Sequence, residues 1–188
     1  MIAGVRPLLA AFLKFSRAID ALNERVGRAV AWLVLAAVLV SSGNAVSRYA
    51  FSLSSNAWLE IQWYLFSAIF LLAAGYTLKH GAHVRIDIVY GRYSPRARAW
   101  LDILGAVFFL MPMALLILYL SWWMFMQSYV GHEISADAGG LVRWPVKLLM
   151  PAGFFLLVLQ GLSEILKRVA FLRGAAPFEE TAKPPDVT

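Results

Sequence analysis

The stretch from Asn56 to Asp87 constrains the fold of this chain more than any other segment. Its apolar run, from Trp58 to Leu78, has about twenty residues, enough to cross roughly 30 Å of hydrocarbon as an α-helix. Glu60 is the only charged residue in that run, and it lies in the first turns beside Gln62. The run ends in a basic loop that contains histidine. A hydrophobic helix with differently charged ends has a preferred orientation in a membrane, so we predict an integral membrane protein.

Composition supports a membrane protein and excludes several other classes. Of the 188 residues, 61% are hydrophobic and seven are tryptophan, more than a soluble domain contains. The net charge of +6 is spread between apolar runs, which is typical of basic loops that face anionic lipid and not of a nucleic-acid interface. Because the chain has no cysteine, thiolate catalysis, disulfides and cysteine-ligated metals are excluded.

The remaining apolar runs predict an all-α protein with four transmembrane helices. These spans are expected at about residues 29–48, 57–78, 97–128 and 146–167. The third is too long for one bilayer, so it should tilt or project into the cytoplasm. The pair Ser94-Pro95 is a helix-start signal, and Pro112 and Pro151 should kink the spans that contain them.

Residues 1–28 are predicted to form an N-terminal amphipathic helix outside the transmembrane domain of residues 29–168. Its apolar face comprises Leu8, Phe12, Phe15, Ile19, Leu22 and Val26. This helix can lie in the cytoplasmic lipid interface, which we favour, or dock on a partner. With no cleavage site in view, we expect the N-terminus to be retained. Residues 169–188 are expected to form a disordered cytoplasmic tail.

The distribution of basic residues predicts the orientation. Fourteen of the 17 lysines and arginines lie in the N-terminal segment, the loop between the second and third spans, and the C-terminal tail. The other three are Arg48, Arg143 and Lys147. Because cytoplasmic loops carry the excess of positive charge, both termini are predicted to be cytoplasmic. The aromatic belt at the outer interface would then comprise Trp58, Trp122, Trp123 and Trp144.

Glu60 is the most informative single residue, because an acid inside a span is costly and usually faces protein. One interpretation makes it a proton or cation carrier. The other, which we favour, makes it a helix-end acid stabilised by the helix N-terminus and by Arg48. The connection between the first two spans is short, so Arg48 and Glu60 are expected near the same membrane face, close enough to pair.

No cofactor or metal site is predicted. All three histidines, His80, His83 and His132, lie in predicted loops and not in spans where they could ligate haem on facing helices. No phosphate-binding glycine motif is present, so no nucleotide site is indicated. The charges lie at span edges and not at a midplane substrate site, which indicates a membrane subunit that works with a partner.

Four runs of residues resemble a known family, the small permease (DctQ-like) subunit of tripartite ATP-independent periplasmic (TRAP) transporters. These runs are Arg48–Phe51, Trp58–Phe66, Gly75–Lys79 and His83–Asp87. A later run, Ala138–Lys147, is similar to the branch labelled mannitol/chloroaromatic transport. Many members carry two adjacent acids at the start of the second span, whereas here Leu59 precedes Glu60 and only one acid can be carried over.

The resemblance implies a multi-pass subunit of a bacterial inner-membrane complex. Its partners would be a large multi-span TRAP permease subunit and a periplasmic substrate-binding protein, with membrane lipid around them and no nucleic acid. In such secondary transport systems the large subunit takes up an organic acid by symport, driven by a sodium or proton gradient. The small subunit braces the large one and offers a periplasmic surface to the binding protein.

We therefore predict a non-enzymatic scaffold subunit of a TRAP transporter, with the loop of residues 131–144 as the docking surface for the binding protein. The residues assigned structural or partner roles are Arg48, Glu60, Gln62, His83, Arg85, Asp87, Arg143 and Trp144. Two alternatives stay open: an autonomous four-span proton-coupled exporter that uses Glu60, and a haem or quinone membrane anchor of an oxidoreductase. The sequence indicates neither the substrate nor the helices that face the large subunit.

Overall fold

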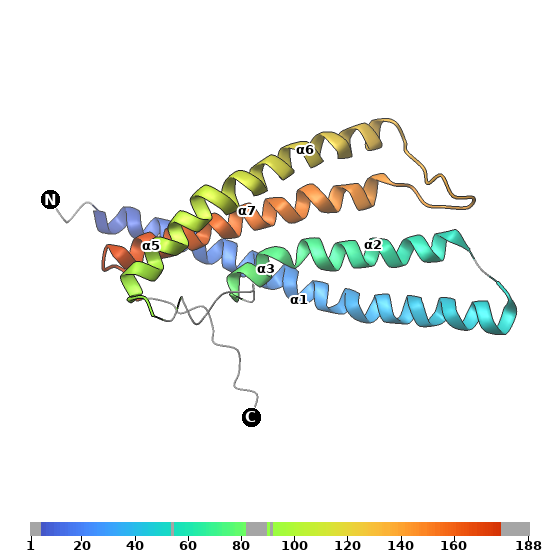
Figure 1. Cartoon of the computed structure of the whole chain (residues 1–188), viewed down its shortest axis with the longest axis horizontal. Helices are drawn as coiled ribbons and strands as arrows, with labels where there is room; N and C mark the ends of the chain where they lie inside the picture. Colours follow the sequence, from blue (N-terminus) through green and yellow to red (C-terminus); the bar gives the residue numbers. More distant parts are fainter. Residues whose placement is uncertain (1–4, 54, 82–89, 91, 178–188) are drawn as a thin grey trace, which may run out of the picture.

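The computed structural model describes residues 5–53, 55–81, 90 and 92–177, and this part of the chain is almost entirely helical (Figure 1). Its elements are α1 (Val5–Phe51), α2 (Asn56–Leu72), α3 (Ala74–Lys79), α5 (Pro95–Gly105), the π-helical turn η1 (Ala106–Leu110), α6 (Met111–Val130) and α7 (Trp144–Leu172). The predicted sites at His83, Arg85 and Asp87 lie outside the described residues.

The predicted all-α fold with four helices able to cross a membrane is confirmed. Four helical segments are long enough and apolar enough to do so: Ala11–Phe51, Asn56–Lys79, Pro95–Val130 and Trp144–Leu172. The second of these is α2 and α3 together, and the third is α5, η1 and α6 together. Each is longer than its predicted span, because helical turns continue beyond the apolar residues from which the spans were predicted.

The helices form an open layer and not a closed four-helix bundle. In the right half of Figure 1, α7 lies between α6 on one side and α2 on the other, and α1 lies beyond α2; in the left half α1 passes across α7, on which it packs. Among the described elements, α6 packs on α7 and η1, while α1 and α2 pack on each other and on α7. The connections α1–α2 and α6–α7 lie at one end of the layer, here called the loop end, and Val5 and Leu172 lie toward the other, the terminal end.

Helix α1 runs for 47 residues without a break through the predicted boundary at residue 28. Near the terminal end it packs on α7 through a polar face, because Ser16 and Asn23 are buried. Much of the predicted apolar face is left uncovered, with Phe12 and Phe15 half exposed, although Ile19 is buried. The helix therefore docks on its own chain. Contact of the uncovered apolar face with the lipid interface stays a prediction.

A cluster of polar side chains fastens α1 to α7. Asn23 Nδ2 donates to Gln160 Oε1 at 2.9 Å, and Gln160 Nε2 donates to Asp20 Oδ1 at 2.8 Å. Ser163 Oγ also donates to Asp20 Oδ1, at 2.9 Å, and the Lys167 ammonium lies 3.1 Å from the other oxygen of that carboxylate. Polar groups in an apolar medium stabilise a helix pair when they bond to each other, so this cluster fixes the register of α1 on α7.

The two prolines inside spans have different local consequences. The turn η1 precedes Pro112, and the Met111 N–H bonds to the Ala106 carbonyl five residues back. This wider turn makes room for a proline ring that cannot donate to the preceding turn, and the rod bends between α5 and α6 (Figure 1). Pro151, by contrast, is buried within α7, which continues past it. The Ser94 cap is confirmed, because Ser94 Oγ accepts from the Ala97 N–H at 3.4 Å.

Candidate functional site

The carboxylate of Glu60 holds the α6–α7 loop against the start of α2. The residue is only 5% exposed. One carboxylate oxygen accepts a hydrogen bond from the Ser135 hydroxyl, and the other accepts from the Leu141 N–H at 2.6 Å. Both donors lie in the loop that connects α6 to α7, more than 70 residues further along the chain. Both oxygens of this acid are therefore bonded to that loop.

Arg143 is the cation next to Glu60. Its Nη2 lies 3.8 Å from Glu60 Oε1 and donates to Ser135 Oγ at 3.1 Å. The serine hydroxyl thus accepts from the guanidinium and donates to the carboxylate, so a charged pair is bridged by a neutral group. This arrangement balances the charge of an acid that the surrounding helices have removed from water.

Two further side chains of α2 contact the same loop. Asn56 Nδ2 donates to the Ala138 carbonyl at 3.0 Å, and the Tyr64 hydroxyl donates to the Val142 carbonyl at 2.9 Å. Asn56, Glu60 and Tyr64 are spaced by four residues, so they lie on one face of α2. We call these three side chains together with residues 133–143 the clasp.

Within the clasp the loop folds back on itself as a short hairpin. An isolated antiparallel bridge pairs Ile134 with Val142, and the Gly140 N–H closes a turn on the Asp137 carbonyl at 3.0 Å. Gly139 has a φ of 72°, in the left-handed region that favours glycine. At Gly140, a Cβ atom would lie 2.9 Å from Glu60 Oε1, so only glycine lets the loop approach the carboxylate this closely.

A second attachment lies beside the hairpin, where the Lys147 ammonium bonds to the Glu133 carboxylate. This hydrogen bond, with the charges of Lys147 and Arg143, holds the pKa of Glu133 below its usual value. A carboxyl with a lowered folded-state pKa stabilises the fold above its ordinary pKa, and that contribution is lost as the pH falls through the lowered pKa. The attachment is therefore present at neutral pH.

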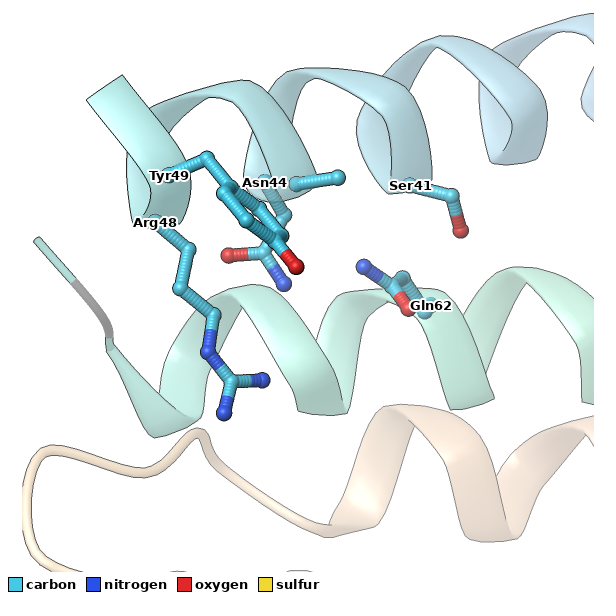
Figure 2. Close-up of a pocket in the computed structure, with 6 residues that line it drawn as sticks. Ser41, Asn44, Arg48, Tyr49 and Gln62 are labelled. Atoms are coloured by element: carbon cyan, nitrogen blue, oxygen red, sulfur yellow. The ribbon is translucent and has the colours of Figure 1, made fainter. Parts of the chain in front are cut away.

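The expected pair of Arg48 with Glu60 is not formed, and this prediction was wrong. Arg48 forms no ion pair within the described residues and instead lines a notch with Gln62 and Asn44 (Figure 2). The physical reason is helix geometry: Glu60 and Gln62 are two residues apart, about 200° around α2. Gln62 therefore faces α1, whereas Glu60 faces the α6–α7 loop.

The predicted site residues thus divide into two groups. Glu60 and Arg143 come together in the clasp, whereas Arg48 and Gln62 both line the notch. Trp144 begins α7 and packs edge-on against Tyr129, with ring centroids 5.5 Å apart. Sequence reasoning missed Ser135, whose only signal was its place before the Gly139-Gly140 turn, and the role of the Leu141 N–H, which no sequence pattern marks.

The clasp is a structural contact and not a reactive centre, because its hydrogen-bond donors and acceptors are bonded to one another. No group of three or more histidine, cysteine or acidic residues suited to a metal occurs within the described part of the chain.

The family model described as "Tripartite ATP-independent periplasmic transporters, DctQ component" matches residues 37–171. That range contains α2 to α6, all of α7 except its last residue, the clasp and the C-terminal part of α1. No curated protein and no solved structure matches the chain. The comparisons give no support to the mannitol/chloroaromatic branch suggested by residues 138–147.

Proposed function

Because the chain belongs to the DctQ component family of tripartite ATP-independent periplasmic transporters, we propose that it is the scaffold that braces a large multi-span permease in the bacterial inner membrane. The permease takes up an organic acid, driven by an ion gradient, and this chain positions the permease and its periplasmic binding protein. It has no enzymatic role in this account.

The open helix layer is the observation that carries this proposal. With α6 in contact with α7 but not packed on α1 or α2, the four spans leave two broad faces uncovered. Large apolar side chains are exposed on all four spans, among them Trp32, Trp63, Phe109 and Phe155. An open layer of this kind offers one face to a partner and another to lipid, as a brace requires.

Charge placement supports an orientation with both termini in the cytoplasm. Arg28 and Lys79, toward the terminal end, pair with Glu24 at 3.0 and 2.8 Å, and Lys167 pairs with Glu164 at 2.6 Å. The loop end has few cations, and Arg143 and Lys147 there are paired with acids. By the positive-inside rule the terminal end is cytoplasmic and the clasp faces the periplasm.

The clasp is the proposed docking surface for the periplasmic binding protein. It presents a rigid hairpin with two exposed apolar side chains side by side, Ile134 at 65% and Val142 at 42% exposure. The acidic Asp137 lies exposed at the turn. A preorganised loop binds with little loss of conformational entropy, which explains why three side chains of α2 hold it in place.

We expect Ile134→Asp to raise the concentration of binding protein needed for half-maximal uptake at least about tenfold, because an apolar contact is replaced by a charge. The measurement is uptake into proteoliposomes that contain the membrane complex, with the binding protein titrated outside. Leu53→Asp is the matched control, since Leu53 is also 65% exposed but lies in the α1–α2 connection. Equal effects of the two substitutions would contradict docking at the clasp.

A further inference from the structure

A polar notch opens between α1 and α2 near the loop end. Ser41, Asn44 and Arg48 line it from α1 and Gln62 lines it from α2, in a volume of about 580 Å³. The spacings of three and four residues place the α1 side chains on one helix face. Figure 2 shows these side chains reaching from α1 toward α2, with Gln62 reaching back and the Tyr49 ring at the outer part of the notch.

The notch extends from the membrane interface into the span. Gln62 lies six residues after Asn56, about 9 Å along α2, and Ser41 lies ten residues before the end of α1 at Phe51, about 15 Å along that helix. Lipid headgroups therefore cover only its outer part, and its inner part is at the depth of the acyl chains.

The polar side chains of the notch have no partner within the described residues: neither a hydrogen bond nor an ion pair of the chain uses Ser41, Asn44, Arg48 or Gln62. Some polar side chains within the spans are bonded to one another, as Asn23 is to Gln160 and Arg168 is to Asp102. Unbonded polar groups at membrane depth are costly, and such residues ordinarily face protein or a polar partner. The notch therefore needs partner groups from outside the described part of this chain.

Charge and depth together select the kind of partner. Arg48 requires an anion at the interface, and a lipid phosphate or a carboxylate would serve equally there. Acyl chains below a phosphate cannot bond to Asn44, Gln62 or Ser41, whereas polar side chains on a protein helix can. A helix with an acid at the level of Arg48 and polar groups below it satisfies the whole notch.

We propose that the notch receives a transmembrane helix of the large permease, which places an aspartate or glutamate against Arg48 and polar side chains against Asn44 and Gln62. This inference rests on the proposed function and adds where the permease docks: on α1 and α2 in the outer leaflet. Arg48 acts here as an interface cation and not as the partner of Glu60.

The first test is the amount of permease that copurifies with Arg48 variants in mild detergent. Arg48→Glu places like charges together and should lower the copurified permease at least about tenfold, while Arg48→Lys keeps the charge and should retain most of it. Because Arg48 has no partner within the described residues, both variants should keep the helical content of the wild type by circular dichroism. Full retention of permease by Arg48→Glu would contradict the proposed ion pair between Arg48 and an acidic residue of the permease.

The second test locates the contact directly. The chain has no cysteine, so a single introduced cysteine carries a photoreactive maleimide at one defined position. Attached at Asn44→Cys, the probe should crosslink to the permease at least about fivefold more than at Val46→Cys, the control two residues away on another face of α1, where the side chain is 61% exposed. Crosslinks from Asn44→Cys to lipid only, or equal permease crosslinks from both, would overturn the proposal.

Wild-type copurification separates this inference from the proposed function. If the wild-type chain copurifies with a large permease but the Asn44→Cys probe does not reach it, the docking site is wrong and the scaffold role stands. If the wild-type chain brings no permease, the scaffold role itself fails.

Discussion

Glu60→Ala is expected to release the α6–α7 loop from α2 and to lower uptake by the complex. The substitution removes both acceptors of the clasp, leaving the Ser135 hydroxyl and the Leu141 N–H without their shared partner. It also leaves Arg143 without the nearby acid. Hydrogen–deuterium exchange of residues 133–143 in the detergent-solubilised complex should accelerate at least about tenfold, because hydrogen bonds to a charged acceptor are the stronger ones.

Glu60→Gln serves as the matched control, because an amide oxygen still accepts one of the two hydrogen bonds and the amide nitrogen can donate to the serine oxygen. It should keep most of the loop protection and most of the uptake. Slow exchange of the loop in Glu60→Ala would contradict the clasp. Loss of uptake in Glu60→Gln with the loop still protected and the complex assembled would show that the acid has a role beyond structure.

Gly153→Ala is expected to destabilise the helix layer by about 2 kcal/mol, within the range measured for overpacked cores. A Cβ at this position would lie 2.5 Å from the Leu71 carbonyl oxygen and 2.8 Å from the Leu71 carbonyl carbon. Those atoms belong to the backbone of α2, so α2 and α7 must move apart at the centre of the layer. The measurement is the free energy of unfolding as sodium dodecyl sulfate is titrated into mild-detergent micelles.

Gly43→Ala is the control for Gly153→Ala, since both glycines lie inside membrane-spanning helices. No atom lies within 4 Å of a Cβ built at Gly43, so alanine should be neutral there or stabilising by up to about 1 kcal/mol through its higher helix propensity. Equal free energies for the two variants would mean that the close approach of α2 to α7 is not needed for stability.

The predictions from the sequence were most accurate for the membrane spans, because bilayer thickness determines the length of a spanning helix. An apolar run of about twenty residues must cross the hydrocarbon as a helix, so the existence of four spans follows from run lengths alone. Local capping was also predictable, because Ser94 and Pro95 specify a helix start through their own backbone chemistry. The four-residue spacing of Gln160 and Glu164 likewise places them on one face of α7, where their side chains are hydrogen-bonded at 3.1 Å.

Contacts between distant segments could not be predicted from polarity. Polar residues mark the exposed surface of a soluble protein, but within a membrane they mark surfaces that face other helices. Asp20 and Glu24 lie outside the apolar face of the predicted amphipathic helix, yet Asp20 bonds to α7 and Glu24 to Lys79. In this part of α1 the polar groups turn toward protein, and much of the apolar face is left uncovered. Because the polar face of α1, and not its apolar face, contacts α7, the sequence pattern did not predict how far α1 docks on α7.

Several residues of the candidate site were predicted from the sequence, but the pairing of Glu60 with Arg143 was not. Glu60, Arg143 and the loop of residues 131–144 were all singled out, but Glu60 was assigned the cation nearest in sequence on the first span. Its partner lies 83 residues downstream, because the face of α2 that holds Asn56, Glu60 and Tyr64 looks toward the α6–α7 loop. Which face of an almost wholly apolar helix meets which neighbour is decided by packing, and the sequence carries no periodic signal for it.

The most direct test of the scaffold role is purification of the chain from its native membrane in mild detergent, with the proteins that accompany it identified by mass spectrometry and their ratio measured. We expect one large multi-span permease per chain. Recovery of the chain without a permease, as a stable assembly of its own copies, would contradict the scaffold role.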